Sequence, residues 1–367
     1  MEEAGDFTGI AVPFTAGAVA GMLLFPNPSS ISTLPAAALA STLFILTVAA
    51  TLFLDSRINA SAFRLCLATL FILCGLFCSI SASLTRGIPT HPEPLVAFAH
   101  NCKNRLCTRI DSIPFPSSDT SGLLKALLTG DRSGLDRNMT AVFRNSGASH
   151  ILALSGLHLG ILYLLLSKLT IPLGNSLMSK KIRYLLIISA GGFYTVMTGA
   201  SPSIVRAFLF ILLRESAILL GRNAGPARIL LSALTIQLVI EPDVISSTGF
   251  QLSYLAVSGI VFLYPALERL YPQSKGWDPF RKTWKASMLT VSCQVFTAPL
   301  AWLKFGTFPR YFLITNLIAL PLTSAVMTVS VATTALFCLG ICPYELIRLD
   351  DTLTRTLISC LEIISSM

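Results

Sequence analysis

Charged residues are scarce in this sequence. Asp, Glu, Lys and Arg make up only 12% of the 367 residues, about half the share of a typical soluble domain, and 53% of the chain is hydrophobic. Length alone would allow two or three soluble domains. Apolar runs recur along almost the whole chain, however, so the composition predicts one polytopic, all-α membrane domain with a few interfacial segments.

Groups that hold metals or phosphates are also few. The chain has four histidines, none of them after His158, and nine cysteines without a C-x-x-C motif or a metal-type spacing. No G-x-x-x-x-G-K-S/T phosphate-binding loop occurs. We therefore expect no bound metal and no other cofactor, and any transport must draw its energy from a partner motor or from another gradient.

Ten apolar segments are long enough, or nearly long enough, to cross a membrane. They cover roughly residues 9–25, 33–54, 62–84, 150–169, 184–200, 204–220, 227–240, 245–265, 284–303 and 311–340. The last is too long for one straight helix and contains Pro321, which either kinks the helix or separates a re-entrant piece from a span. The sequence predicts about ten transmembrane helices.

Basic residues are unevenly distributed over the short loops. If the segments alternate across the membrane, one side collects thirteen Lys and Arg residues and the other only Arg206, Lys304 and Arg310. The more basic side should be cytoplasmic, which places the N-terminus inside and residues 85–149 outside. Topology signalling thus accounts for most of the net charge of +9.

The long outer segment has amphipathic patterns. Residues 93–113 carry apolar side chains at every third or fourth position, which predicts an amphipathic helix. Ser118 and Asp119 offer caps for two shorter amphipathic pieces, which are broken by Gly130 and Gly134. These helices either lie in the outer leaflet or form a basic vestibule above a pore.

The C-terminal tail, residues 343–367, is predicted to be a further amphipathic helix that lies on the membrane or packs against the bundle. Its apolar stripe would consist of Leu346, Leu349, Leu353, Leu357 and Cys360.

The segment 150–169 carries His150, Ser155 and His158, which are costly in a membrane without a partner or a purpose. Ser155 and His158 share a face of a helix, which raises the hypothesis of an intramembrane serine protease. Two observations oppose it: a base three residues away is expected to point alongside the serine, and Ala153 stands where a G-x-S-x-G turn needs its first glycine. On one helix the two histidines would also lie about 12 Å apart along the axis, too far to share a metal.

The other interpretations of this segment are structural or concern transport. Ser149, Ala153, Gly156 and Gly160 are small residues at three- and four-residue spacing, which favours close helix packing. Alternatively, this face lines an aqueous path. Polar residues in later apolar runs repeat the pattern, namely Arg206, the pair Arg214 and Glu215, Gln251, Ser253, Gln294 and Asn316.

Several of these strings resemble conserved blocks of the ComEC competence family. The string "ALLTGDRSGLDRNMTAVFRNSGASHILALSGLHLGIL" is similar to its signature, and "TGASPSIVRAF", "TGFQLSYLAVSGI" and the run 292–321 resemble later blocks in the same order. The resemblance covers about residues 121–327. It implies an inner-membrane channel that takes up transforming DNA as a single strand, after the other strand has been degraded.

By the resemblance, His150, Ser155, Gly156 and His158 fall in the most characteristic block, and Gly130, Asp131, Arg132, Arg206, Gln251 and Ser253 fall in the others; Gln294 and Asn316 are added as polar residues of later apolar runs. The channel or motif candidates are His150, Ser155, Gly156, His158, Arg206, Gln251, Ser253, Gln294 and Asn316. A strand with one charge per nucleotide needs distributed positive charge. The phosphate-binding candidates are Lys125, Arg132, Arg137, Arg144, Lys304 and Arg310. Whether these residues touch DNA or build the pore is left open by the resemblance.

The chain departs from fuller family members. These carry an OB-like domain and a metallo-β-lactamase-like nuclease domain, and we expect neither here. The expected segments are 1–86, an N-terminal three-helix membrane region; 87–149, external amphipathic helices; 150–340, the channel core; and 341–367, the tail. We expect no enzyme activity. The expected partners are single-stranded DNA, the lipid bilayer, a separate nuclease, a DNA receptor, an ATP-driven cytoplasmic motor and, in a homo-oligomer, further copies of the chain. The alternatives are a secondary transporter of a small organic anion and, more remotely, the protease.

Overall fold

The computed structural model describes residues 2–24, 60–85, 94–174, 176–272, 278–306 and 311–366, and these contain helices but no strand. The α-helices are α1 (Glu2–Leu24), α3 (Ala60–Thr85), α4 (Pro94–Asp111), α5 (Ser118–Thr129), α6 (Arg137–Asn145), α7 (Ser149–Leu152), α8 (Gly156–Leu169), α9 (Leu177–Met197), α10 (Pro202–Leu219), α11 (Pro226–Ile240), α12 (Thr248–Ser258), α13 (Tyr264–Glu268), α14 (Pro279–Phe305), α15 (Phe312–Cys338) and α16 (Tyr344–Ser365). The predicted all-α class is confirmed. The helix expected at 33–54 lies outside the described residues.

Four helical stretches are long and apolar enough to span a membrane: Gly156–Leu173, Thr248–Glu268, Phe280–Phe305 and Phe312–Cys338. Three shorter apolar helices lie at Gly9–Leu23, Leu67–Ile80 and Pro226–Ile240. Helices α9 and α10 are of sufficient length, but each carries three charged residues. The expected number of about ten crossings is therefore not confirmed by the described residues.

The chain divides into two compact units, and the first combines residues 1–91 with 222–258. Within it α1 packs against α3 and α11, and a short 3-10 helix, η2 (Pro242–Ser246), contacts α12. Gly17 and Gly75 let α1 and α3 approach closely, because a Cβ on either would overlap backbone atoms of the other helix. The hydroxyl of Tyr254 donates to Oε1 of buried Gln237 at 3.0 Å.

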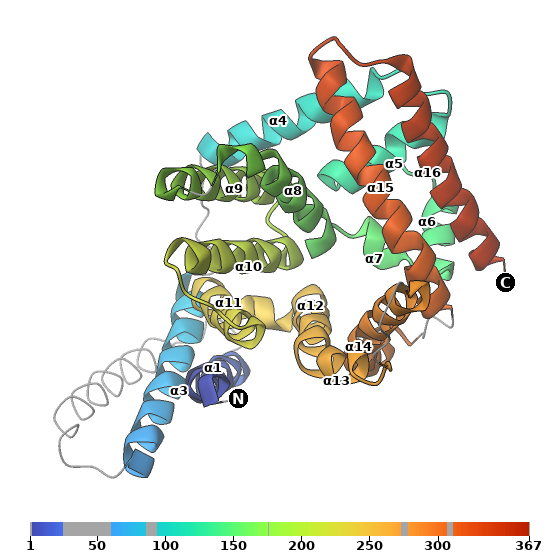
Figure 1. Cartoon of the computed structure of the whole chain (residues 1–367). Helices are drawn as coiled ribbons and strands as arrows, with labels where there is room; N and C mark the ends of the chain where they lie inside the picture. Colours follow the sequence, from blue (N-terminus) through green and yellow to red (C-terminus); the bar gives the residue numbers. More distant parts are fainter. Residues whose placement is uncertain are drawn as a thin grey trace. The chain divides into compact units, whose positions relative to one another are not determined.

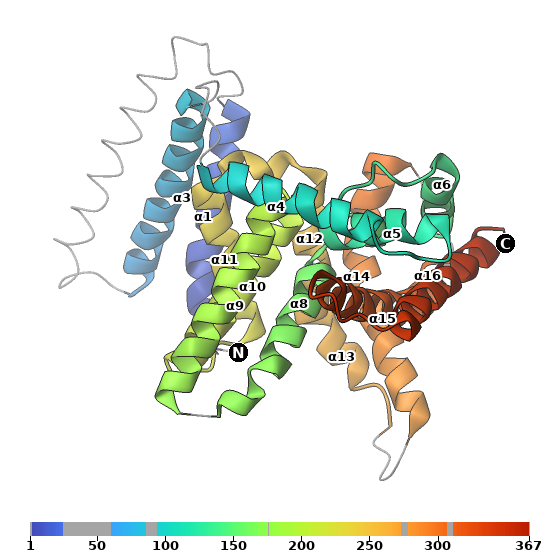
Figure 2. The same ribbon diagram turned by 90° about the horizontal axis from the view of Figure 1, so that it is seen from above.

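The second unit combines residues 92–221 with 259–367. Helices α8, α9 and α10 lie side by side, α15 and α16 form an antiparallel pair, and α4 runs across α9 toward α5 (Figures 1 and 2). The main core lies between α5, α15 and α16, with Leu124, Leu127, Phe143, Val326 and Leu357 completely buried.

The outer amphipathic segment differs in part from expectation. Helix α4 forms as predicted, but α5 is no surface helix, because most of its side chains belong to the core. Its N-cap is Ser117, and neither Ser118 nor Asp119 takes that position. Asp351 of α16 receives hydrogen bonds from the Ser117 N–H and from Thr120 Oγ1, at 3.2 and 2.6 Å. The carboxylate of Asp351, from another helix, thus accepts the free N–H at the start of α5, a role that the sequence predicted for Ser118 or Asp119.

Two expectations about the C-terminal helices are also corrected. Helix α15 is continuous from Phe312 to Cys338 and contains Pro321, so this proline separates no re-entrant piece. Helix α16 packs against α15, α5 and α6, which is one of the two expected arrangements, namely packing against the bundle. The predicted apolar stripe is right in part: Leu357 is completely buried and Leu346, Leu353 and Cys360 are partly buried, but Leu349 is exposed, and Asp350 and Asp351 are buried in addition.

Candidate functional site at a broken helix

The predicted helix over residues 150–169 is broken. Helix α7 ends at Leu152, Ala153 is extended with φ −72° and ψ 124°, and α8 begins after the N-cap Ser155 with φ −122° and ψ 169°. The short serine side chain can cap a helix N-terminus, and Gly156 follows it directly. The small residues that suggested helix packing therefore lie on either side of a break, and the geometry expected for one continuous helix is wrong.

Ser155 and His158 form a reciprocal cap at the start of α8. Ser155 Oγ accepts a hydrogen bond from the Leu157 N–H at 3.3 Å, and His158 Nδ1 accepts one from the Ser155 N–H at 3.1 Å. Ser155 Oγ also lies 3.1 Å from His158 Nδ1, so the expectation that the histidine points alongside the serine is wrong. Because capping occupies both side chains, this short distance does not by itself indicate a nucleophile and its base.

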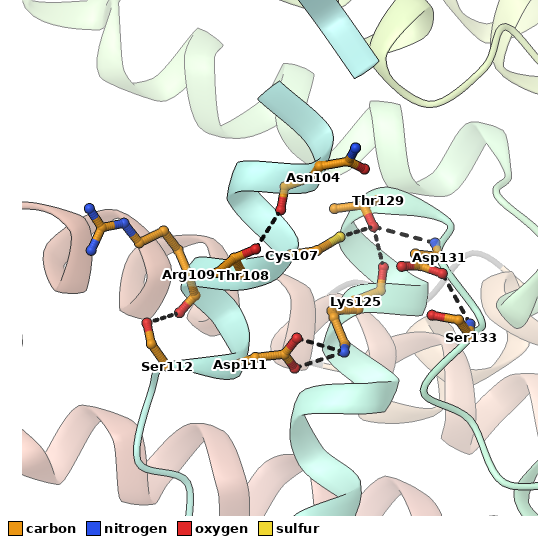
Figure 3. A network of polar contacts seen from close by, with 10 residues as sticks. All are labelled: Asn104, Cys107, Thr108, Arg109, Asp111, Ser112, Lys125, Thr129, Asp131 and Ser133. Carbon is orange, nitrogen blue, oxygen red and sulfur yellow. Dashed lines mark hydrogen bonds and ion pairs between the residues drawn. The ribbon is translucent and has the colours of Figure 1, made fainter. Parts of the chain in front are cut away.

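Arg132 holds the other side of the break. Its Nε and Nη2 donate to the carbonyl oxygen of Leu152 at 3.1 and 2.8 Å, which satisfies an acceptor that the end of α7 leaves free. The turn that precedes Arg132 starts at Gly130, whose φ of 75° favours glycine; a Cβ there would also overlap Leu154 Cδ1 unless that side chain moved. Asp131 accepts from the Ser133 N–H at 3.0 Å, and this bond holds the pKa of its carboxyl below the ordinary value (Figure 3).

Arg206 lies next to the first turn of α8. Its side chain comes from the second turn of α10 and is 8% exposed, and its guanidinium lies 6.0 Å from the centre of the Phe210 ring. A Cβ built on Gly156 would be 3.1 Å from Arg206 Nη2. A buried guanidinium beside a helix N-terminus creates a positive region that favours an anionic group.

The other phosphate-binding candidates are distributed around the second unit. Lys125 is paired with Asp111, with Nζ 2.7 Å from Oδ1 (Figure 3), and its side chain is only 13% exposed. Arg137 and Arg144 are exposed on α6, and Lys304 is exposed in the last turn of α14. Arg310 lies outside the described residues. Of the described phosphate-binding candidates, only Arg132 therefore comes close to the broken helix, where the channel candidate Arg206 also lies. The roles of all six phosphate-binding candidates in DNA binding stay predictions.

The remaining motif candidates fall in both units. His150 Nδ1 lies 3.2 Å from the Gly147 carbonyl oxygen. Gln251 donates to the Ile245 carbonyl at 2.8 Å, and Ser253 follows on the same helix of the first unit. In the second unit Gln294 is partly buried, and Oδ1 of Asn316 is buried without a hydrogen-bond partner among the described residues. The structure thus brings Ser155, Gly156, His158 and Arg206 together, and His150 lies near His158 on the adjoining α7.

Two polar contacts were not predicted from the sequence. Tyr163 of α8 donates to Oε1 of the buried Glu215 at 2.7 Å, and Arg214 lies over the Tyr163 ring at 5.8 Å from its centre. Ser330 Oγ donates to Asp350 Oδ1 at 2.7 Å. Only part of the second contact could be inferred from the sequence. Asp350 and Asp351 interrupt the apolar pattern of residues 343–367, but the local pattern does not indicate that their side chains are buried.

Metal-ligand geometry is not found in the described ranges, where no group of three or more His, Cys, Asp or Glu side chains could hold an ion. Cys102 and Cys107, which both lie on the unbroken helix α4, are free cysteines.

Known proteins match the segment that contains the broken helix. The family model described as "Competence protein" matches residues 127–367, which is well over half of the chain. This chain belongs to the competence protein family. It is 27% identical over 203 residues to ComE operon protein 3 of Bacillus subtilis, a match that covers 55% of this chain and 25% of that protein.

Two other proteins are similar at the same level. Competence protein ComA of Neisseria gonorrhoeae is 27% identical over 216 residues, which cover 58% of this chain and 30% of that protein. The uncharacterized protein YcaI of Escherichia coli is 26% identical over 156 residues, or 41% of this chain and 20% of that protein. The match thus spans less than a third of each of these relatives. No solved structure matches the chain.

Proposed function

We propose that this member of the competence family is a membrane channel through which transforming DNA passes as a single strand. The carrying observation is the position of Arg206, a buried guanidinium beside the N-terminus of α8 where the chain breaks between α7 and α8. Family membership supports a role in DNA uptake, and the apolar helices support a location in a membrane.

The physical argument concerns the charge of the cargo. Every nucleotide carries a phosphate, and a phosphate inside a low-dielectric region needs positive charge or backbone N–H groups close to it. The first turn of a helix offers such N–H groups, and Arg206 adds a charge that cannot be lost by deprotonation. The phosphates of a single strand could therefore move past Arg206 and the first turn of α8 one at a time. Arg132 and the exposed Arg137 and Arg144 would add positive charge before it.

Transformation frequency tests the proposal. Arg206→Gln should lower the number of transformants by at least about tenfold, because one lost charge-assisted contact costs about 1.5–3 kcal/mol. Arg206→Lys should retain more uptake, and Arg222→Gln, at an exposed arginine, should be neutral. Protein amounts in the membrane must be equal for all variants. Deletion of the gene with unchanged transformation would contradict the proposal.

A second candidate function, a secondary transporter of a small organic anion, uses the same positive region. The two are separated in liposomes that contain the purified chain. A transporter gives saturable flux of the small anion that single-stranded DNA does not inhibit, whereas the channel admits or is blocked by the oligonucleotide.

The proposed channel requires partners and a location. We place the chain in the bacterial inner membrane with its N-terminus in the cytoplasm, on the distribution of its basic loops. A nuclease would supply the single strand, a DNA receptor would deliver it, and an ATP-driven motor or a gradient would pull it in. Further copies of the chain could complete the pore.

A further inference from the structure

A pocket with polar and apolar walls lies in the second unit, between the end of α13 and the start of α14. Its volume is about 350 Å³, within the range of small-ligand sites. Two stretches that are apolar enough to span a membrane reach this place, since Thr248–Glu268 ends here and Phe280–Phe305 begins here. In a membrane the pocket would therefore lie where the two helices leave the hydrocarbon for the headgroup layer.

Cations outnumber carboxylates around the pocket. Lys285 Nζ lies 2.7 Å from Glu268 Oε1, so these two charges largely neutralise each other. Arg269 and Arg281 also line the pocket, and both are exposed, so an anion that enters from solvent can reach them. Even when Asp278 beside the pocket is counted, three cations face two carboxylates in the described part of this region. The pocket therefore favours a negatively charged group.

Two aromatic rings form the other side of the pocket. The ring centres of Tyr271 and Trp284 lie 5.7 Å apart, with their planes tilted by 47°. The Tyr271 hydroxyl donates to Asp278 Oδ2 at 2.6 Å, and Asp278 Oδ1 accepts the Phe280 N–H at 3.0 Å at the start of α14. These bonds fix the tyrosine ring and occupy both oxygens of the carboxylate. Tyr and Trp beside Arg and Lys are typical of the membrane–water interface.

Exposed apolar side chains occur on the same helices. Phe262, in the π-helical turn η3 (Gly259–Leu263), is 55% exposed, and Leu270 and Phe280 are 69% and 74% exposed. Large apolar side chains in water beside a basic pocket indicate a partner with apolar parts. The acyl chains of a lipid would cover them, whereas a polynucleotide would leave them in water.

We propose that this pocket binds the headgroup of an anionic phospholipid, with its phosphate on Arg269 and Arg281 and its acyl chains on the neighbouring apolar side chains. A phosphodiester stays charged at physiological pH and matches the planar fork of a guanidinium. The distribution of basic loops places this end of α14 at the cytoplasmic leaflet, whose surface is negative. The inference goes beyond the proposed channel and does not rest on it.

The test uses the full chain, purified in detergent, and two lipids with the same acyl chains. The probes are dioleoylphosphatidylglycerol, which is anionic, and dioleoylphosphatidylethanolamine, whose ammonium group would meet the excess of cations. Thermal unfolding at increasing lipid content of the micelles gives apparent dissociation constants. We expect the anionic lipid to bind about tenfold more tightly. Equal stabilisation by the two lipids would overturn the proposal.

Charge-matched variants separate the pocket from a general attraction between a basic protein and an anionic micelle. The double variant Arg269→Gln, Arg281→Gln should weaken binding of phosphatidylglycerol at least tenfold. The control is Arg105→Gln, Arg348→Gln, which removes two exposed arginines of α4 and α16 and should leave binding unchanged. If the first double variant does not fold, Arg281→Gln is compared with Arg105→Gln. The same loss in both sets of variants would contradict the proposal.

Two further probes separate a lipid from other sources of phosphate. Inorganic phosphate and a twelve-residue oligothymidylate are added to the protein in place of the lipid. If inorganic phosphate stabilises the protein as strongly as phosphatidylglycerol, the acyl chains contribute nothing and the lipid is excluded. Stabilisation by the oligothymidylate that is lost on replacing Arg269 and Arg281 would assign the pocket to nucleic acid instead. None of these measurements depends on DNA uptake, so their outcome is distinguishable from that of the transformation experiment.

Discussion

Arg132 and Leu152 are joined by two hydrogen bonds, from Nε and Nη2 of the arginine to one carbonyl oxygen, at 3.1 and 2.8 Å. The carbonyl is available because α7 ends at Leu152, and the arginine is in place because the turn after α5 directs it there. One contact thus connects the turn that carries Asp131 with the broken helix that carries Ser155 and His158. The predictions below test this arrangement and the buried polar contacts around it.

Replacing Arg132 should destabilise the junction between α7 and α8. Arg132→Ala leaves the Leu152 carbonyl without its donors, which costs about 1.5–3 kcal/mol and lowers the thermal unfolding midpoint in detergent. Arg132→Lys should recover only part of this, since an ammonium does not reproduce the fork of two N–H groups. Arg137→Ala, at an exposed arginine of α6, is the matched control. If both alanine variants unfold alike, the contact with Leu152 contributes nothing.

Gly130 should not tolerate a side chain. Its φ of 75° is unfavourable for alanine, and a Cβ there would overlap Leu154 Cδ1. Gly130→Ala should therefore destabilise the protein by more than about 1 kcal/mol, as a lower unfolding midpoint. Adding Leu154→Ala removes the overlap but not the backbone strain, so recovery should be partial. Gly160→Ala, at a helical position with open space around it, should be neutral or slightly stabilising.

The contact between Tyr163 and Glu215 should be cooperative. Tyr163→Phe leaves a buried carboxyl of α10 without its donor and should cost about 1–3 kcal/mol. A double-mutant cycle with Glu215→Gln measures the coupling between α8 and α10 from the midpoints of the four proteins. Strictly additive effects would show that the two side chains do not interact.

Asp350 should make stability depend on pH. Burial raises the pKa of its carboxyl from 3.8 to about 6, despite the hydrogen bond from Ser330. The folded state therefore binds the proton more tightly than the unfolded state, so stability is full at low pH and is lost as pH rises to about 6. The loss is about 3 kcal/mol, from roughly two pKa units at 1.36 kcal/mol each.

Unfolding midpoints between pH 4 and 7 check this sign. Asp350→Asn should flatten the curve and raise the midpoint at pH 7, because residue 350 then carries no charge that must be buried. Glu362→Gln, at an exposed position of the same helix, should keep the original dependence. A midpoint that rises with pH in the unaltered protein but not in Asp350→Asn would contradict the prediction.

Much of the fold could be predicted because it depends on local patterns. Helices α1, α3, α4, α9, α10, α11 and α14 lie close to the apolar segments or amphipathic periods that predicted them. The number of crossings could not be predicted, since charges such as Lys180 and Lys181 in α9 are compatible with either a span or an interfacial helix. Of the two alternatives at Pro321, the re-entrant piece is excluded because α15 is continuous, and surrounding helices can satisfy the backbone groups that a proline frees.

The candidate site was predicted only as a set of residue types. Ser155 and His158 were recognised as a pair three residues apart, but a continuous helix was assumed, and on a continuous helix their side chains would lie in parallel. The break changes this, because Ser155 becomes a cap and draws His158 Nδ1 onto its own N–H. Arg206 was predicted only as one of the polar residues in the apolar runs and as a channel or motif candidate. Its position beside Gly156 follows from the packing of α10 on α8.

By itself, the sequence determined that the chain is helical, apolar enough for a membrane and similar to competence proteins. These properties follow from composition, periodicity and ordered motifs, which are local. Only the tertiary structure decided that α7 and α8 separate, that α5 is buried, and that Asp350 and Asp351 face inward. The physical reason is that each depends on contacts between distant residues, such as Arg132 with Leu152 and Ser117 with Asp351. The partners of these hydrogen bonds are 20 and 234 positions apart in the sequence, so the contacts produce no periodic pattern in it.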